Sequence, residues 1–309
     1  SEHGIGVFRI FDALNDIRNL KVAIDAALKC PEKPHVQGCL VYTISPVHTN
    51  ESFVELAVEL EKMGCHSVCI KDMSGLLKPY VAEDLVKKLK AAVKIPIELH
   101  THCTSGFGHA TYLKAIEAGV DIIDTALAPF SSDTSQPCTE TMVAMLEGEE
   151  RDTGLDRQAM TPISKYFLGV KQDLIKTFNL KGYFDVNPNV LDFQIPGGML
   201  SNLANQLKEA GMEDKYQDLL DEMPRVRKDV GYPPLVTPSS QIVGTMATFN
   251  VMSGERYKMV PNEFKDLARG KFGRTPVEVD RKFLTDTLHI APEDIIEDCS
   301  IEDAKATTF

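Results

Sequence analysis

His100 and His102 stand one residue apart, directly after the apolar segment 95–99. On an extended strand, side chains two residues apart project from the same face, so both imidazoles would point to one place. Neutral imidazole is the commonest protein ligand for divalent transition metals. The pair therefore predicts a site for one metal ion. The alternative is an ordinary strand that carries two half-exposed histidines.

Lys71 ends a second apolar segment, 67–70, about thirty residues before the histidine pair. If both segments are parallel strands, the lysine and the histidines lie together at the carboxyl ends of those strands. Active sites of β/α barrels lie at that end of the sheet. A simpler interpretation of Lys71 is an ion pair with the neighbouring Asp72, and the spacing alone leaves both interpretations open.

Apolar extended segments alternate with amphipathic ones through the first half of the chain, with a period of about thirty residues that is typical of βα units. The predicted strands are 5–11, 36–43, 67–71, 95–102 and 121–126, and the predicted helices are 17–29, 52–63, 81–92, 108–118 and 138–146. After about residue 150 the alternation stops, and helices are predicted at 158–178, 202–209, 214–229 and 241–251. We therefore predict a partial barrel over residues 1–150 and an α-rich extension over residues 151–309.

The predicted number of βα units raises a difficulty for the barrel. A (β/α) barrel closes with eight strands, whereas the sequence offers about five. Five parallel strands alone would leave two unpaired edges, which native proteins avoid. The sequence therefore predicts either an open, doubly wound sheet or a TIM-type barrel whose first three units are missing from this sequence.

Composition narrows the classes of function. The net charge of −12 argues against a nucleic-acid partner, because binding to phosphates needs clustered Lys and Arg. The sequence contains no apolar run near the roughly 20 residues of a membrane span, and no signal-peptide pattern. Its seven cysteines are odd in number and scattered, which is typical of reduced thiols in a cytoplasmic protein.

Six sequence motifs, in order, extend this interpretation. They lie at residues 8–16 (FRIFDALND), 42–48 (YTISPVH), 70–75 (IKDMSG), 100–106 (HTHCTSG), 195–199 (IPGGM) and 235–241 (LVTPSSQ). Together they resemble the biotin-dependent carboxyltransferase family. This family includes the oxaloacetate decarboxylase alpha subunit, the transcarboxylase pyruvate/oxaloacetate subunit and the carboxyltransferase part of pyruvate carboxylase.

The resemblance implies a TIM-type barrel followed by a helical funnel over its mouth, with this chain beginning at the fourth barrel strand. It implies a divalent metal, zinc, manganese or cobalt, bound by His100, His102 and Lys71, the lysine as a carbamate. A free ammonium cannot be a ligand because it has no lone pair. The family's metal-binding aspartate and its keto-acid-binding arginine belong to strands that are absent from the sequence, so we expect an incomplete metal shell and a poorly active isolated chain.

The resemblance also assigns roles to four other residues. Thr237 would move a proton between biotin and the enolate carbon, although it could also be a helix N-cap before Pro238. Ser240 and Gln241 would line the biotin ureido pocket. Asp12 would be a substrate- or biotin-binding residue at the barrel mouth, with a structural role near Asn15 as the alternative. Asp133 replaces the family's usual glycine, and we expect its turn to survive because aspartate tolerates left-handed geometry.

The implied function is carboxyl transfer between a 2-keto acid, oxaloacetate or pyruvate, and biotin, through a metal-stabilised enolpyruvate. The sequence has no biotinylation motif, so biotin would arrive on a separate carrier domain or subunit. The resemblance further implies a homodimer and leaves open a membrane decarboxylase subunit as a partner. Two alternatives remain: a metal-dependent acyl-CoA lyase or Claisen-type synthase of a related barrel, and a non-catalytic fragment.

Overall fold

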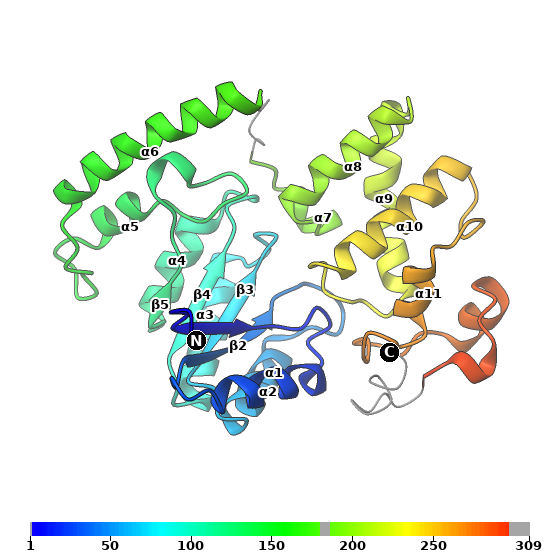
Figure 1. Ribbon diagram of the computed structural model, residues 1–309, viewed down its shortest axis with the longest axis horizontal. Helices are drawn as coiled ribbons and strands as arrows, with labels where there is room; N and C mark the ends of the chain where they lie inside the picture. Colours follow the sequence, from blue (N-terminus) through cyan, green and yellow to red (C-terminus); the bar gives the residue numbers. More distant parts are fainter. Residues whose placement is uncertain (1, 180–185, 297–309) are drawn as a thin grey trace.

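The computed structural model describes residues 2–179 and 186–296. Within these residues one parallel sheet contains five strands in sequence order, and Figure 1 labels β2 to β5 of this sheet. The strands are β1 (Val7–Ile10), β2 (His35–Val41), β3 (Ser67–Asp72), β4 (Ile97–Thr101) and β5 (Ile122–Ile123). All five strand predictions are confirmed, although β5 is much shorter than predicted.

A helix follows each strand, as the periodicity predicted. These helices are α1 (Ile17–Leu28), α2 (Asn50–Lys62), α3 (Pro79–Ala92), α4 (Gly108–Glu117) and α5 (Thr139–Leu146). Side-chain caps mark the starts of the first two. The Asp16 side chain caps α1, and Thr49 and Ser52 form a reciprocal capping box at α2. The local sequence therefore contributes directly to the βα alternation.

The two faces of the sheet differ in chemistry. Side chains that face the helices are aliphatic and fully buried, among them Val36, Leu40, Val68, Ile70, Ile97 and Leu99. Gly38 belongs to this face, since a Cβ on it would lie 2.7 Å from the Leu60 side chain of α2. The opposite face is polar and carries Arg9, Gln37, Lys71, Glu98 and His100. Because successive side chains of a strand point to opposite faces of the sheet, each strand contributes residues to both faces.

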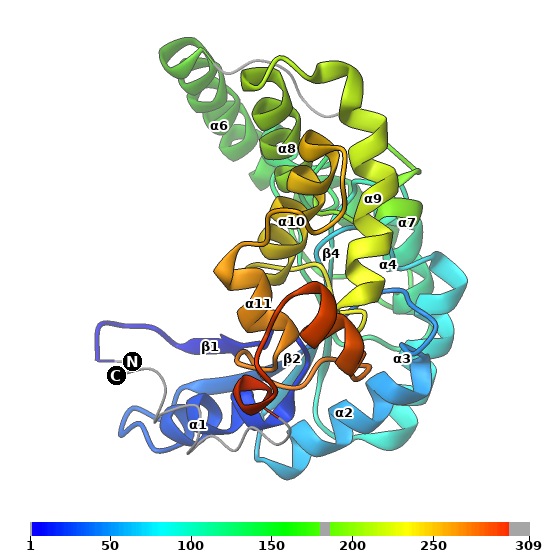
Figure 2. The ribbon, with the colours of Figure 1, turned by 90° about the vertical axis from the view of Figure 1, so that its right-hand side faces the viewer.

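The second half of the chain is α-rich, as predicted. Its helices are α6 (Arg157–Phe178), α7 (Val190–Phe193), α8 (Gly197–Glu209), α9 (Tyr216–Asp229), α10 (Ser239–Ser253) and α11 (Asn262–Ala268). In Figures 1 and 2, α7 to α11 gather together, whereas α6 stands apart beside α5. The sequence did not predict the two shortest helices, α7 and α11. A domain boundary at residue 150 stays a prediction.

Arg227 of α9 fastens the helical part to the sheet. Its guanidinium is buried and donates to the Ile44 carbonyl at 2.9 Å and the Thr43 hydroxyl at 2.8 Å, both in the loop after β2. A third bond goes to the Gln194 side chain at 2.5 Å. Burial lowers the pKa of Arg227 to about 10, which leaves it charged at neutral pH. No helix among residues 2–179 and 186–296 is long and apolar enough to cross a membrane.

Candidate active site

Lys71 and His100 are neighbours across β3 and β4, because the parallel register pairs them directly. The alternation of side chains sends the next residue, Asp72, to the other face. There its carboxylate accepts hydrogen bonds from the Leu76 and Leu77 amides, both at 2.9 Å. The ion pair between Lys71 and Asp72 is therefore not observed. The Lys71 ammonium lies instead 5.2 Å from the ring centroid of Phe11.

The two histidines face each other through their Nε2 atoms, which are 3.1 Å apart. The other nitrogen of each ring is already engaged. Nδ1 of His102 donates to the Thr134 carbonyl at 2.5 Å, and Nδ1 of His100 lies 2.7 Å from Oδ2 of Asp124. Burial lowers the pKa of His102 to about 4, so this ring is neutral at pH 7. The Nε2 atom of each ring therefore faces the other ring.

This arrangement fits a metal ion. Two lone pairs that converge at 3.1 Å repel each other unless a cation or a proton lies between them, and two metal–nitrogen bonds of about 2.0–2.1 Å can span that distance. Across the described residues, no three His, Cys, Asp or Glu side chains gather into a metal cluster. Among the described residues, the donors at this position are thus two imidazoles, with Lys71 on the neighbouring strand.

Backbone turns hold His102 in place. Ser132 and Asp133 have φ values of 66° and 49°, in the left-handed region, and the turn presents the Thr134 carbonyl to the ring. The prediction that Asp133 preserves this turn is confirmed. On the other side, Gly75 has a φ of 69°, and a Cβ there would lie 2.5 Å from the His102 carbonyl oxygen. Only glycine fits such a close approach.

A hydrogen-bonded network beneath the histidines was missed by sequence reasoning. Arg9 of β1 donates to Gln37 at 2.6 Å, to Asp124 at 2.6 Å, and to Glu98. Gln37 also donates to Glu98 at 2.7 Å. Burial raises the pKa of Asp124, but hydrogen bonds from His100 and Arg9 outweigh burial and hold it well below the usual value. The available signal was polar residues at alternate positions of otherwise apolar strands.

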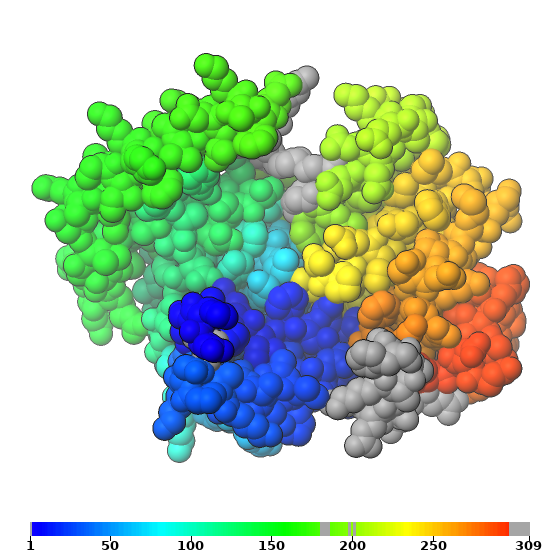
Figure 3. All heavy atoms as spheres, in the orientation of Figure 1, coloured from blue at the N-terminus to red at the C-terminus, as the bar shows by residue number. Residues whose placement is uncertain are grey.

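Thr237 lies in a cavity of about 260 Å³ at the junction of the two halves. The cavity is lined by Phe11, Asp12, Ala13, Leu14, Thr237, Pro238, Ser239, Ile242, Leu267 and Phe272. Figure 3 shows the segment after β1, in blue, against the start of α10, in yellow. Pro238 occupies the N-cap position of α10, and no side chain caps that helix, so the capping role considered for Thr237 is not observed. Phe11 contacts both this cavity and Lys71, so the two parts of the site share a wall.

Asp12 has a structural role in the wall of this cavity. Its carboxylate accepts from the Leu14 and Asp16 amides, both at 2.9 Å, and from the Asn19 side chain at 3.0 Å. Burial raises the pKa of Asp12. Asn15 joins the same loop to β2 through two 2.9 Å bonds with the Val41 backbone. The structural alternative predicted for Asp12 is therefore observed, at the edge of the Thr237 cavity.

Ser240 and Gln241 lie on the first turn of α10, close to Thr237 in sequence. Ser240 is buried and Gln241 is exposed. Neither is among the residues that line the Thr237 cavity. Their assignment to a biotin pocket stays a prediction.

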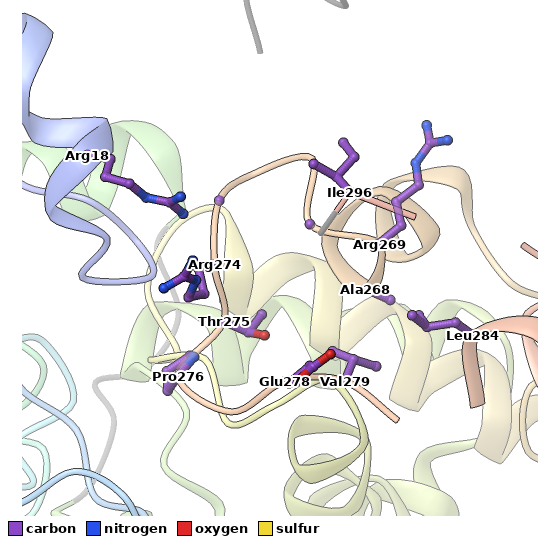
Figure 4. Close-up of a pocket in the computed structure, with 12 residues that line it drawn as sticks. Arg18, Ala268, Arg269, Arg274, Thr275, Pro276, Glu278, Val279, Leu284 and Ile296 are labelled. Carbon is purple, nitrogen blue, oxygen red and sulfur yellow. The ribbon is translucent and has the colours of Figure 1, made fainter. Parts of the chain in front are cut away.

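A second cavity, of about 380 Å³, lies between the start of α1 and segment 268–279 (Figure 4). Three arginines line it: Arg18, Arg269 and Arg274. Arg18 is paired with Asp16, and Arg269 with Asp266. Figure 4 shows the Arg269 side chain extending away from the other two. These arginines therefore do not converge on one ligand position.

Known proteins are similar to this chain in sequence and in architecture. Residues 190–307 match a family described as "Conserved carboxylase domain", and residues 35–166 match the HMGL-like family. A pyruvate carboxylase subunit from Methanocaldococcus jannaschii is 52% identical over 287 residues, which cover 93% of this chain and 50% of that protein. The methylmalonyl-CoA carboxyltransferase 5S subunit of Propionibacterium freudenreichii is 46% identical over 284 residues, 91% of this chain and 55% of that protein.

A solved structure agrees with these matches. The carboxyl transferase domain of Rhizobium etli pyruvate carboxylase superposes with a TM-score of 0.88 at 33% identity, covering 98% of this chain and 52% of that one. Fold and sequence together define a TIM-type parallel β/α protein with a helical extension. The chain belongs to the biotin-dependent carboxyltransferase family, as the six motifs predicted. It spans about half the length of the curated relatives it matches.

Proposed function

We propose that this chain provides the carboxyltransferase site for carboxyl transfer between a 2-keto acid and biotin on a carrier. The observation that carries the proposal is the convergence of His100 and His102 beside Lys71, with Phe11 as the wall shared with the Thr237 cavity. Relatives named pyruvate carboxylase and 2-oxoglutarate carboxylase support a 2-keto acid as the substrate class. Oxaloacetate and pyruvate are the proposed pair.

His100, His102 and Lys71 would hold the divalent metal, which we propose to be zinc, manganese or cobalt. The imidazoles are ready for this role because both Nδ1 atoms are engaged and both Nε2 atoms converge. Lys71 would join them after its amine takes up CO2 as a carbamate and loses a proton, since an ammonium has no lone pair. A metal bound there would polarise the keto oxygen of the substrate and stabilise the enolate form of pyruvate.

Thr237 would carry the proton that moves between a biotin nitrogen and the enolate carbon. A hydroxyl suits this role because it both donates and accepts a hydrogen bond. Its side chain is exposed at the cavity, and helix α10 does not use it as a cap. Phe11 and Phe272 line the same cavity and would exclude water from it. Ser240 and Gln241 would contact the biotin from the first turn of α10.

The partners follow from this chemistry. Biotin would be delivered by a carrier domain or subunit, and we propose a homodimer as the assembly. A membrane decarboxylase subunit remains a further predicted partner. The described cysteines, Cys30, Cys39, Cys65, Cys69, Cys103 and Cys138, are all free thiols, which supports a reducing compartment and hence a cytoplasmic location.

Replacement of Thr237 tests the proposal. In the complete enzyme that contains this chain, Thr237→Ala should lower biotin-dependent carboxyl exchange with pyruvate about 10²–10⁴-fold, as expected when a group that transfers protons is lost. Thr245→Ala, on the helix α10 that follows Thr237, is the matched control and should retain full activity. Exchange that survives Thr237→Ala undiminished would refute the role of this hydroxyl.

The HMGL-like match over residues 35–166 supports a second candidate, a metal-dependent acyl-CoA lyase or Claisen-type synthase. The carboxylase match over residues 190–307, which contain Thr237, favours the carboxyltransferase. Activity that requires an acyl-CoA and is indifferent to biotin would favour the second candidate.

A further inference from the structure

We propose that Asp124, held by Arg9, is a positioning residue that fixes the ring of His100 in the tautomer whose Nε2 lone pair faces the metal position. The proposal rests on the proposed function for the identity of the metal ligands. It adds to the site two residues on opposite edges of the sheet, to which the sequence motifs gave no role.

The histidine pair has an alternative arrangement that would exclude a metal. With their Nε2 atoms 3.1 Å apart, one ring could donate an Nε2–H hydrogen bond to the other. In such a pair the two Nε2 atoms are joined by a hydrogen bond, which leaves no position between them for a metal. The Thr134 carbonyl prevents this for His102, because a carbonyl oxygen can only accept and therefore requires Nδ1–H. His100 needs an equivalent acceptor.

Asp124 is that acceptor. Its Oδ2 lies 2.7 Å from Nδ1 of His100, and an ionised carboxylate can only accept a hydrogen bond. The proton of a neutral His100 is thereby held on Nδ1, and its Nε2 keeps a lone pair. Histidines that bind metals commonly use a carboxylate partner on the far ring nitrogen to set tautomer and orientation. Gln136 lies on the Nε2 side, with its amide nitrogen 3.5 Å away.

Arg9 fixes the carboxylate. Its Nη1 donates to the same Oδ2 of Asp124 at 2.6 Å, while its Nε and Nη2 bind Gln37 and Glu98. Arg9 is on β1 and Asp124 directly follows β5, so this ion pair spans the two edge strands of the sheet. The planar guanidinium has donors in a fixed fork, which lets one side chain hold three partners at set positions. Asp124 is thus oriented from the opposite edge of the sheet.

Asp124→Asn is the test, measured on the purified chain in two ways. The amide can present its NH2 group to Nδ1, which moves the proton of His100 to Nε2. Competition with a chelator should show Zn²⁺ binding weakened about 10–100-fold, the effect of losing an outer-shell partner of a metal ligand. In the metal-free protein, ¹⁵N NMR of the histidine rings should show His100 change from Nδ1–H to Nε2–H. Asp25→Asn, which removes an exposed carboxylate paired with Lys21, is the matched control and should change neither.

The two readouts separate the possible failures. If the parent chain binds none of Zn²⁺, Mn²⁺ and Co²⁺, the metal site proposed for this chain is refuted, while the NMR comparison still tests whether Asp124 sets the tautomer of His100. Unchanged ring nitrogen shifts and unchanged Zn²⁺ affinity in a folded Asp124→Asn protein would overturn the inference. Should that variant fail to fold, Arg9→Lys keeps the charge and removes the fork. It should broaden or split the His100 signals, and a wild-type NMR pattern in Arg9→Lys would equally overturn the role of Arg9.

Discussion

On the face of the sheet that packs against the helices, Leu40, Ile70 and Leu99 are fully buried among other aliphatic side chains. On the opposite face, Arg9, Gln37 and Glu98 are buried or half-buried and hydrogen-bonded to one another. Truncating a buried aliphatic side chain lowers the free energy of unfolding roughly in proportion to the apolar atoms removed. A polar network behaves differently, because removing one member leaves its partners unsatisfied. We conclude that the first face maintains the fold, whereas the second orients the side chains of the proposed metal site.

The largest effect on stability is expected on the aliphatic face. Leu99→Ala should lower the free energy of unfolding by about 4 kcal/mol, because Leu99 is fully buried in the interior strand β4 and its truncation leaves a cavity. Urea denaturation checks this value. Leu168→Ala, at a position 46% exposed on α6, is the control and should cost less than about 0.5 kcal/mol. Zn²⁺ affinity per folded molecule should not change in either variant. Weakened Zn²⁺ binding in folded Leu99→Ala would contradict the conclusion that the two faces have separate roles.

A smaller loss of stability with a larger functional effect is expected on the polar face. Arg9→Met should lower the free energy of unfolding by about 3 kcal/mol, because Glu98 and Asp124 lose the cation that compensates their charges. The same variant should weaken Zn²⁺ binding, unlike Leu99→Ala. Adding Glu98→Gln to Arg9→Met should recover part of the stability, since one uncompensated carboxylate is removed. If the double variant loses as much stability as the two single variants together, the three side chains do not act as one network.

Much of the fold could be predicted from the sequence because local patterns determine it. The strand predicted at 67–71 is β3 (Ser67–Asp72), and the helix predicted at 81–92 is α3 (Pro79–Ala92). Both have strong apolar patterns and defined ends. Helices α7 (Val190–Phe193) and α11 (Asn262–Ala268) are too short to show a repeating apolar face, which is why they were missed.

For the candidate site too, some residues could be predicted from local sequence patterns and others could not. His100 and His102 could be placed from their spacing, and Lys71 from the parallel register of two adjacent strands. Thr237 was assigned by resemblance alone. The Arg9–Asp124 ion pair joins residues 115 positions apart, and it forms only because the sheet brings its two edges within reach of one guanidinium. No local pattern in a single sequence encodes that distance.

The position of a bound metal tests the assignment most directly. Crystals of this chain loaded with Zn²⁺ should give an anomalous difference peak within about 2.0–2.2 Å of Nε2 of both His100 and His102, with continuous density to the Lys71 side chain. That result would establish the ligand set proposed for the carboxyltransferase site. Zn²⁺ peaks that lie elsewhere, with the two imidazoles hydrogen-bonded to each other, would contradict it.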